Sequence, residues 1–309
     1  MLFLKKSLYT MSIIVLGTVA LDTIKTPAGQ RKKILGGSAS HFAMSARLFT
    51  NVNLVAIIGE DFPKKYIDFL KQKRINLTSL IKERGKTFHW EGEYRGDLNT
   101  ALTLNTELGV LSAFRPQITE HQKDIEYIFL ANVDPDIQNH LLSSMRSPKL
   151  IGLDSMNYWI RHKKNSLLRL LKKVDVYVAN DAEARELSGE SNLFNAARKL
   201  RRLGPKMVVI KKGEHGVIFY CDRFIFSFPG YPVTKVIDPT GAGDTFAGGF
   251  MGYLAKAGNN SESNLRKALA YATVIASFNV EDFGLDRTAN LTLSQIEKRL
   301  NSFKKYIHF

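Results

Sequence analysis

Residues 238–250 read Asp-Pro-Thr-Gly-Ala-Gly-Asp-Thr-Phe-Ala-Gly-Gly-Phe, the most informative stretch of the chain. A glycine-rich bend leads into a helix, because the apolar residues Ala247, Phe250 and Leu254 recur on one helical face. Backbone N–H groups at a helix N-terminus bind anions, and glycine lets a phosphate approach them closely. A carboxylate repels such an anion. The presence of Asp244 beside the bend is therefore best explained by a catalytic role, in which it takes a proton from a hydroxyl while the bend holds a phosphoryl group.

The alternative is an ordinary turn between a strand and a helix, with Asp244 as the helix cap. Asp238 and Thr240 weaken this alternative, since a second carboxylate and a hydroxyl then converge on the same bend. The chain has no Walker A pattern, which excludes a P-loop enzyme.

Outside this stretch, strand-like and helix-like segments alternate. Short apolar runs near turn signals predict buried parallel strands over 13–16, 54–58, 127–130, 150–153, 174–178 and 207–210. Helical patterns cover 39–49, 66–72, 138–145, 166–172, 181–187, 194–203, 243–257, 263–279 and 293–304. The alternation predicts an α/β fold, a doubly wound and mainly parallel sheet with helices on both faces.

Two segments, 23–35 and 85–113, break the alternation with half-polar, strand-like patterns. We expect them to form a small inserted β-sheet, a lid on one large domain made of residues 11–22, 36–84 and 114–309.

One lid segment carries three aromatic residues, Phe88, Trp90 and Tyr94, whose alternate spacing puts them on one face of a strand. They can stack on the base of a nucleoside or cover a sugar. The alternatives are packing within the lid or a contact between the edge strands of two copies, which would make a homodimer through the lid.

Composition narrows the class of protein. The 309 residues are 44% hydrophobic and carry a formal net charge of +15. Such a charge attracts nucleic acid or phosphorylated ligands, but the Lys and Arg residues are scattered over predicted surface helices, so we expect no nucleic-acid partner. Cys221 is the single cysteine, which excludes a disulfide framework and fits a cytoplasmic protein. No apolar run reaches about 18 residues, so no membrane span is expected.

The first residues resemble a signal peptide superficially, because Lys5 and Lys6 precede an apolar run. Residues 12–17 are better explained as the buried first strand. Residues 1–10 then form a loose extension, and Met11 is an alternative start.

Other polar groups follow predicted strands, where open α/β sheets bind ligands. Asp22 follows the first strand, Gly36-Gly37 opens a helix that contains His41, and Asp154 and Asn157 follow another strand. Asn180 and Glu183 have the spacing of a capping box, so one explanation for them is that they only cap the N-terminus of a helix. The segment 211–216, with Lys211 and Gly213, is also explained by a basic hairpin turn.

Taken together, these motifs resemble the ribokinase-like (pfkB) family of carbohydrate and nucleoside kinases, whose signature is Asp-Thr-x-Gly-Ala-Gly-Asp. Pro239 stands where Thr is common. The resemblance implies that Asp244 is the general base and that Gly241, Ala242 and Gly243 form the anion hole for the transferred γ-phosphoryl group. It also implies a monovalent cation such as K⁺ near Asp238 and Thr240.

The resemblance assigns the remaining motifs to the two substrates. Asp22, Gly36 and Gly37 would bind acceptor hydroxyls together with His41, where many sugar-specific members carry Asn. Asn180 and Glu183 would organise Mg²⁺ and phosphate. Lys211 and Gly213 would lie at the triphosphate, and residues 272–282 would border the adenine.

The sequence therefore predicts an ATP-dependent kinase that phosphorylates a hydroxyl of a small sugar-type acceptor. The alternative acceptor is a nucleoside of the adenosine type, which His41 and the lid aromatics favour. The remote alternative is a non-catalytic relative that binds nucleotide or nucleic acid.

Overall fold

The structure is a computed structural model that describes residues 11–96 and 98–307. The expected N-terminal extension, residues 1–10, lies outside the described residues.

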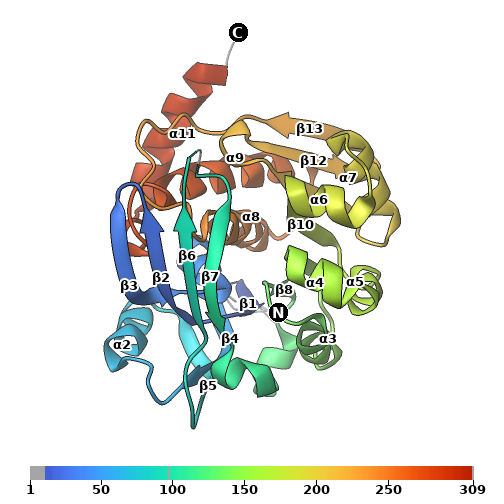
Figure 1. The fold of residues 1–309 in the computed structure, drawn as a ribbon. Helices are drawn as coiled ribbons and strands as arrows, with labels where there is room; N and C mark the ends of the chain where they lie inside the picture. Colours follow the sequence, from blue (N-terminus) through green and yellow to red (C-terminus); the bar gives the residue numbers. More distant parts are fainter. Residues whose placement is uncertain (1–10, 97, 308–309) are drawn as a thin grey trace, which may run out of the picture.

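A nine-stranded sheet forms the centre of the described part of the chain, in the order β13-β12-β11-β10-β9-β8-β1-β4-β5 (Figure 1). Neighbouring strands from β5 to β11 pair in parallel, and β12 and β13 add an antiparallel hairpin. The strands are β1 (Ser12–Leu16), β4 (Asn51–Gly59), β5 (Asn76–Glu83), β8 (Tyr127–Leu130), β9 (Leu150–Asp154), β10 (Val176–Asn180), β11 (Met207–Lys211), β12 (Val217–Cys221) and β13 (Phe224–Phe228).

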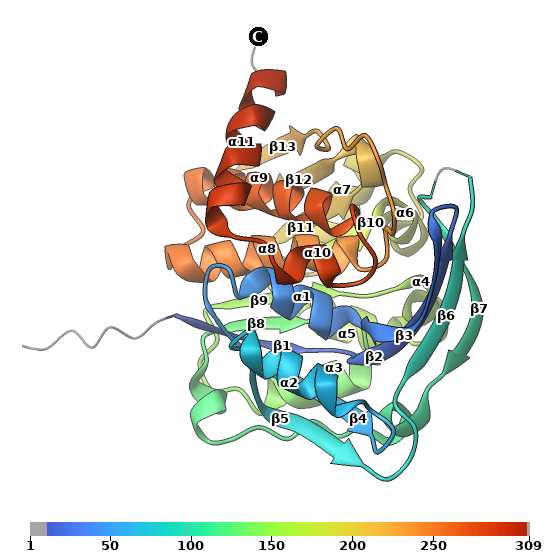
Figure 2. The same ribbon diagram turned by 90° about the vertical axis from the view of Figure 1, so that its left-hand side faces the viewer.

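Helices cover both faces of this sheet, so the predicted doubly wound fold is confirmed (Figure 2). One apolar core joins the sheet to α1 (Ser38–Ala46), α2 (Lys64–Gln72), α8 (Ala242–Ala257), α9 (Glu262–Asn279), α10 (Asp286–Ala289) and α11 (Leu293–Ile307). A second core on the opposite face joins it to α3 (Pro135–Ser143), α4 (Asn157–His162), α5 (Lys164–Leu171), α6 (Asp181–Ser188) and α7 (Leu193–Arg202).

A separate four-stranded sheet lies beside the large one, in the order β3-β2-β6-β7 (Figures 1 and 2). Its strands are β2 (Ala20–Thr26), β3 (Gly29–Gly36), β6 (His89–Tyr94) and β7 (Ala101–Glu107). The sheet begins earlier in the chain than expected: Asp22 lies inside β2, because residues 20–22 pair with residues 34–36 of β3. Asp22 is therefore carried by the small sheet.

Three strands and two α-helices have no counterpart in the sequence prediction: β5, β12, β13, α4 and α10. β5 is a half-polar edge strand, whose pattern gives no continuous apolar run. The β12–β13 hairpin turns at Asp222 and Arg223, and α4 is a single short helix of six residues.

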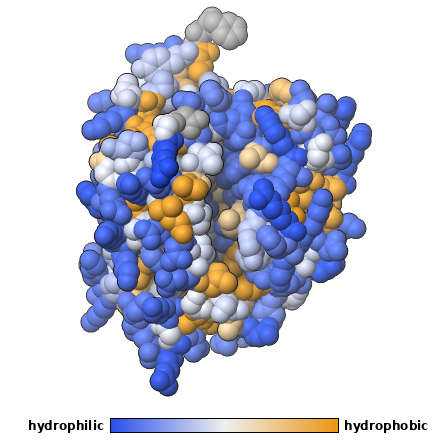
Figure 3. All heavy atoms as spheres, in the orientation of Figure 1, coloured by the Kyte–Doolittle hydropathy of each residue, from blue (hydrophilic) through white to orange (hydrophobic). Residues whose placement is uncertain are grey.

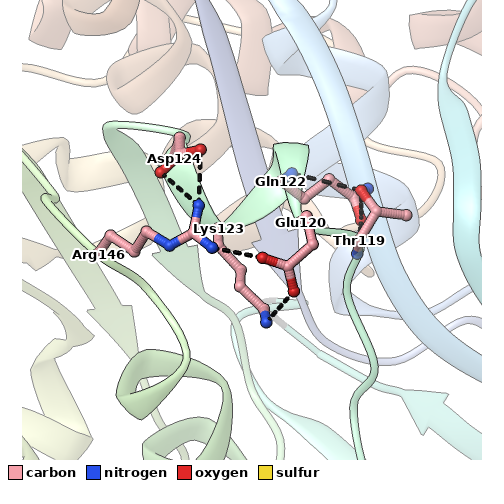
Figure 4. A network of polar contacts seen from close by, with 6 residues as sticks. All are labelled: Thr119, Glu120, Gln122, Lys123, Asp124 and Arg146. Atoms are coloured by element: carbon pink, nitrogen blue, oxygen red, sulfur yellow. Dashed lines mark hydrogen bonds and ion pairs between the residues drawn. The ribbon is translucent and has the colours of Figure 1, made fainter.

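Charged residues cluster on the surface where the chain approaches β8 and β9 (Figure 4). Arg146 pairs with Asp124 at 3.0 Å and also contacts Glu120, which in turn pairs with Lys123. These groups precede the amino ends of the two parallel strands. The network therefore lies at the end of the sheet opposite to the carboxyl ends, where ligands bind in open α/β sheets.

Among residues 11–96 and 98–307, no helix has the length and apolar character needed to cross a membrane.

Candidate active site

The N-terminus of α8 has the features expected of an anion hole. Gly241 is the N-cap, and its φ of 71° is left-handed. The Ala242 N–H donates to the Pro239 carbonyl at 3.1 Å. The N–H groups of Gly243 and Asp244 donate to no acceptor among the described residues, so both are free to bind an anion.

Asp244 lies half-buried in the first turn of this helix. Its carboxylate has no hydrogen-bond partner within the described part of the chain. Burial, and then the charge of Asp154, raise the pKa of Asp244 to about 7, although Lys211 acts in the opposite direction. A carboxylate with a pKa near the operating pH and no competing donor is suited to accept a proton.

Asp154 and Lys211 form an ion pair next to this turn. Asp154 ends β9 and Lys211 ends β11, and the distance from Lys211 Nζ to Asp154 Oδ2 is 3.0 Å. A Cβ atom at Gly243 would lie 2.7 Å from Lys211 Nζ, so the glycine leaves room for the ammonium. Asn157, which we expected near the site together with Asp154, donates to Glu186.

Asn180 and Glu183 form the capping box of α6, as the structural alternative predicts. Glu183 Oε2 accepts from the Asn180 N–H, and Asn180 Oδ1 accepts from the Glu183 N–H, both at 2.8 Å. Glu183 is buried. Burial, and then the charge of Asp154, raise its pKa to about 8, so the pair also belongs to the electrostatics of the site.

The described residues contain no cluster of three or more His, Cys, Asp or Glu that could hold a metal by themselves. Hard carboxylate oxygens converge at the site nevertheless, and burial and mutual repulsion disfavour their charges. This donor set fits Mg²⁺ bound through water and phosphate oxygens.

Asp22 faces the two glycines at the start of α1. Its Oδ2 accepts from the Gly37 N–H at 3.3 Å, and a Cβ atom at Gly36 would lie 1.9 Å from the same oxygen. Burial raises the pKa of Asp22 to about 7, and the charges of Asp238 and Asp244 add to this effect. The structure thus brings Asp22 within electrostatic reach of Asp244.

His41 is linked to the anion hole through Asn279, a residue of the segment 272–282 that we expected to border the adenine. Asn279 Nδ2 donates to the Thr240 carbonyl at 2.8 Å, so its Oδ1 accepts from the Thr245 hydroxyl at 2.9 Å. His41 Nδ1 lies 3.1 Å from the same Oδ1 and must therefore carry its proton. Burial lowers the pKa of His41 to about 4, so the ring is neutral. The only sequence feature that points to Asn279 is that it is a polar residue at the end of a helix with an apolar face.

Asp238 ties two loops together. Its Oδ1 accepts from the Thr240 N–H and its Oδ2 from the Gly284 N–H, both at 2.9 Å. Thr240 Oγ1 also donates to the Tyr94 hydroxyl of the small sheet at 3.3 Å. The bend that leads into α8 is therefore held from two sides.

The small sheet contacts the large body near this bend. Ile24 and Tyr94 form an apolar cluster with Phe283, a residue without a sequence signal. Trp90 belongs to the edge of that cluster, whereas Phe88 packs against the core of the large sheet. The lid aromatics thus contribute to packing. Figure 3 shows a hollow between the small sheet and the body that carries α4 and α6.

Gly213 lies in the short loop between the antiparallel strands β11 and β12, so the predicted hairpin turn is present. A Cβ atom at Gly213 would lie 2.6 Å from Asn99 Oδ1, in the loop that joins β6 to β7. The tip of the small sheet therefore reaches the loop that follows Lys211.

Comparison with known proteins agrees with this geometry. The sequence pattern described as "pfkB family carbohydrate kinase" matches residues 10–291. The chain belongs to the pfkB family. This pfkB protein is 33% identical over 247 residues to "Cytidine kinase" of Thermococcus kodakarensis. The alignment covers 78% of this chain and 87% of that protein. It is 27% identical to "Nucleoside kinase" of Methanothermobacter thermautotrophicus, over 84% and 82% of the two chains.

Solved structures share the fold of this pfkB protein. The nucleoside kinase of Methanocaldococcus jannaschii aligns with a TM-score of 0.76 at 23% identity, over 95% of this chain and 99% of that one. A putative ribokinase II from E. coli, in complex with ATP and Mg²⁺, aligns with a TM-score of 0.79 at 18% identity, over 94% and 99%. The predicted ribokinase-like fold is confirmed.

The pfkB protein is thus a kinase of the carbohydrate or nucleoside type, a phosphotransferase that acts on an alcohol group. The remote alternative of a non-catalytic relative is not supported.

Proposed function

We propose that this protein is an ATP-dependent nucleoside kinase that phosphorylates a hydroxyl of the ribose, with Asp244 as the general base. One observation carries the phosphoryl-transfer part of the proposal: an unpartnered carboxylate lies beside two unpartnered backbone N–H groups in the first turn of α8. Proton acceptance and anion stabilisation are thus available within one helical turn.

In the proposed reaction the hydroxyl proton of the acceptor moves to the Asp244 carboxylate. The acceptor oxygen forms a bond to the γ-phosphorus as the bond from that phosphorus to the bridging oxygen breaks, and ADP leaves with the electron pair. The N–H groups of Gly243 and Asp244, with the Lys211 ammonium, stabilise the charge on the transferred group. Bound Mg²⁺ would neutralise phosphate charge, and Asn180 and Glu183 would orient it through water.

Asp22 is the group that would bind acceptor hydroxyls, and the Gly37 N–H, which donates to its Oδ2, would orient it. A buried carboxylate accepts a hydroxyl hydrogen bond strongly, and Asp22 lies in the small sheet, so acceptor binding would hold that sheet against the body. His41 Nε2 is buried and has no partner among the described residues. With the proton on Nδ1, it would accept a hydrogen bond from an acceptor hydroxyl.

The nucleoside, rather than a free sugar, is favoured by the relatives: the cytidine and nucleoside kinases align over more than three quarters of this chain. Sugar kinases match the chain less well than the cytidine kinase does: a ribokinase of Staphylococcus aureus is 33% identical over only 37% of this chain, and Fructokinase-2 of Zea mays is 25% identical over 78% of it. The sugar-type acceptor therefore becomes the second candidate.

The test is an ADP-release assay with Mg·ATP over a panel of cytidine, uridine, adenosine, inosine, ribose and fructose. We expect the highest kcat/KM with a nucleoside. Turnover restricted to ribose or fructose would overturn the nucleoside assignment, and no turnover with any acceptor would overturn the kinase mechanism.

We also propose a monovalent cation near the bend at Asp238 and Thr240. Both carboxylate oxygens of Asp238 accept backbone N–H groups, so this carboxylate would act by fixing the loop. The same assay with KCl replaced by tetramethylammonium chloride tests it: we expect lower kcat without K⁺, and equal rates would contradict it.

We propose further that two copies pair through the small sheet. β7 is an edge strand, and its Leu102 and Leu104 side chains are 50% and 51% exposed. Light scattering on the wild type and on Leu102→Lys/Leu104→Lys tests the contact. We expect a dimer that the substitutions convert to a monomer, and a monomeric wild type would refute it.

A further inference from the structure

The ion pair between Asp154 and Lys211 is nearly removed from solvent. The exposed fractions of the two side chains are 6% and 17%. Burying two charges costs desolvation that their attraction scarcely offsets, so such a pair is weak grounds for a stabilising role. A structural role alone does not explain why the chain places it here.

The position of the ammonium points to an anion. Lys211 Nζ lies over the first turn of α8, 2.7 Å from the place of a Cβ atom at Gly243. The N-terminus of a helix carries a partial positive charge, so a lysine beside it is repelled. An anion bound between the ammonium and the free N–H groups of Gly243 and Asp244 turns this repulsion into attraction.

Asp154 decides where the ammonium lies. Burial opposes the charge of Lys211, but the charges of Asp154, Glu183 and Asp244 raise its pKa above the usual value, so the lysine stays protonated. Of these carboxylates only Asp154 is hydrogen-bonded to it. A lysine paired with Asp244 instead would occupy the group that must accept the proton.

We propose that Asp154 is a positioning residue for phosphoryl transfer: it holds the Lys211 ammonium over the first turn of α8, where Lys211 binds the outermost phosphoryl group of the nucleotide and leaves Asp244 free. The inference rests on the proposed kinase mechanism. An ammonium has three N–H donors; one goes to Asp154, and the other two remain for phosphoryl oxygens.

Four variants test the inference: Asp154→Asn, Lys211→Met, the double variant, and Glu186→Gln as the control. Glu186 contacts Asn157 and Arg161 of α4, is 26% exposed, and makes no hydrogen bond or ion pair with Asp154, Lys211 or Asp244 among the described residues. Steady-state kinetics give kcat and the KM of each substrate, and calorimetry gives the affinities for ADP and for a non-hydrolysable imido analogue of ATP.

We expect both single substitutions to lower kcat by about 10²-fold, as loss of one group that stabilises developing charge does, with the acceptor KM changed by less than about threefold. Lys211→Met should weaken binding of the ATP analogue while leaving that of ADP unchanged. The double variant should be no slower than Lys211→Met, because Asp154 acts only through the lysine. Glu186→Gln should match the wild type.

Multiplied losses in the double variant would overturn the inference, as would a kcat of Asp154→Asn within about threefold of wild type. If Asp154→Asn leaves an unpaired buried charge and unfolds, the comparison of the double variant with Lys211→Met still decides. If the wild type phosphorylates no acceptor, the proposed function fails. The comparison of the ADP and analogue affinities then still tests the position of Lys211.

Discussion

At the scale of the residue, Asp244 is the group on which the proposed reaction depends most directly. We expect Asp244→Asn to lower kcat by about 10²- to 10⁴-fold, the range for removal of a general base. The amide keeps the shape of the side chain, so the affinity for the ATP analogue should be retained. The measurement is ADP release together with calorimetric nucleotide binding.

Asp222→Asn is the matched control for this substitution. Asp222 is 65% exposed and pairs with Arg201 on the surface, so its loss should leave kcat unchanged. A kcat of Asp244→Asn within about tenfold of wild type would contradict the assignment of the base.

The pH dependence of the rate reports the same residue. Burial and the charge of Asp154 raise the pKa of Asp244 to about 7, and only the ionised form accepts a proton. Below pH 7 the carboxyl group is protonated. The value of kcat/KM should therefore fall tenfold for each pH unit below about 7 and stay level above it.

Asp22, whose pKa is also about 7, and Glu183, at about 8, titrate in the same interval, so the observed values belong to the group of carboxyls. The limb due to Asp244 should be absent from the residual activity of Asp244→Asn. A flat wild-type profile from roughly pH 5.5 to 8.5 would contradict the proposed base.

At the scale of the element, two glycines at the N-terminus of α8 differ in what a methyl group added in their place would contact. A Cβ atom at Gly241 would lie 2.3 Å from the His41 ring, and its φ of 71° is left-handed. We expect Gly241→Ala to lower the free energy of unfolding by about 1–3 kcal/mol and to abolish activity.

Gly243→Ala differs, because the neighbour at 2.7 Å is the flexible end of Lys211. Displacing the ammonium should reduce kcat while Tm stays near the wild-type value. Gly258→Ala, at the other end of the same helix, is the control. Its φ is 73° and its nearest atom would be 3.6 Å away, so we expect a loss of about 1 kcal/mol with full activity. Equal stability losses in Gly241→Ala and Gly243→Ala would contradict this distinction.

The elements also show what the sequence can and cannot predict. β1, β4 and β8–β11 were predictable because each is a short apolar run, buried on both faces, between turn signals. β5 was not, since an edge strand needs no continuous apolar run. The capping box of α6 was readable from spacing alone, because its two hydrogen bonds are local.

At the scale of the whole molecule, the contacts that could not be predicted from the sequence are those between residues far apart in the chain. Asn279 reaches His41 across 238 positions of the chain, and Phe283 meets Ile24 and Tyr94 only because the small sheet lies against the body. Asp154 and Lys211 converge because β9, β10 and β11 are neighbours in the sheet. Strand order, and not local pattern, determines these pairs.

The carboxyl groups of the site also determine how the stability of the whole ligand-free protein depends on pH. Burial raises the pKa of Asp22 and Asp244 to about 7 and that of Glu183 to about 8. The folded protein therefore holds protons that the unfolded chain releases near pH 4, and this stabilisation is lost as the pH rises through 7 and 8. His41, whose pKa burial lowers to about 4, acts in the opposite sense, but only between about pH 4 and 6.5.

We therefore expect a higher Tm for the ligand-free protein at about pH 6.5 than at about pH 8.5, measured by scanning calorimetry. Asp244→Asn removes one of the three ionisations, so it should raise Tm at the higher pH and narrow the difference between the two. Asp222→Asn, on the surface, should leave the difference unchanged. Equal wild-type Tm values at the two pH values would show that the site carboxyls ionise without cost, which is incompatible with their burial. Keeping Asp244 ionised in this environment therefore lowers the stability of the ligand-free protein. Binding of Mg·ATP should raise Tm most at the higher pH, where the carboxyl groups are ionised.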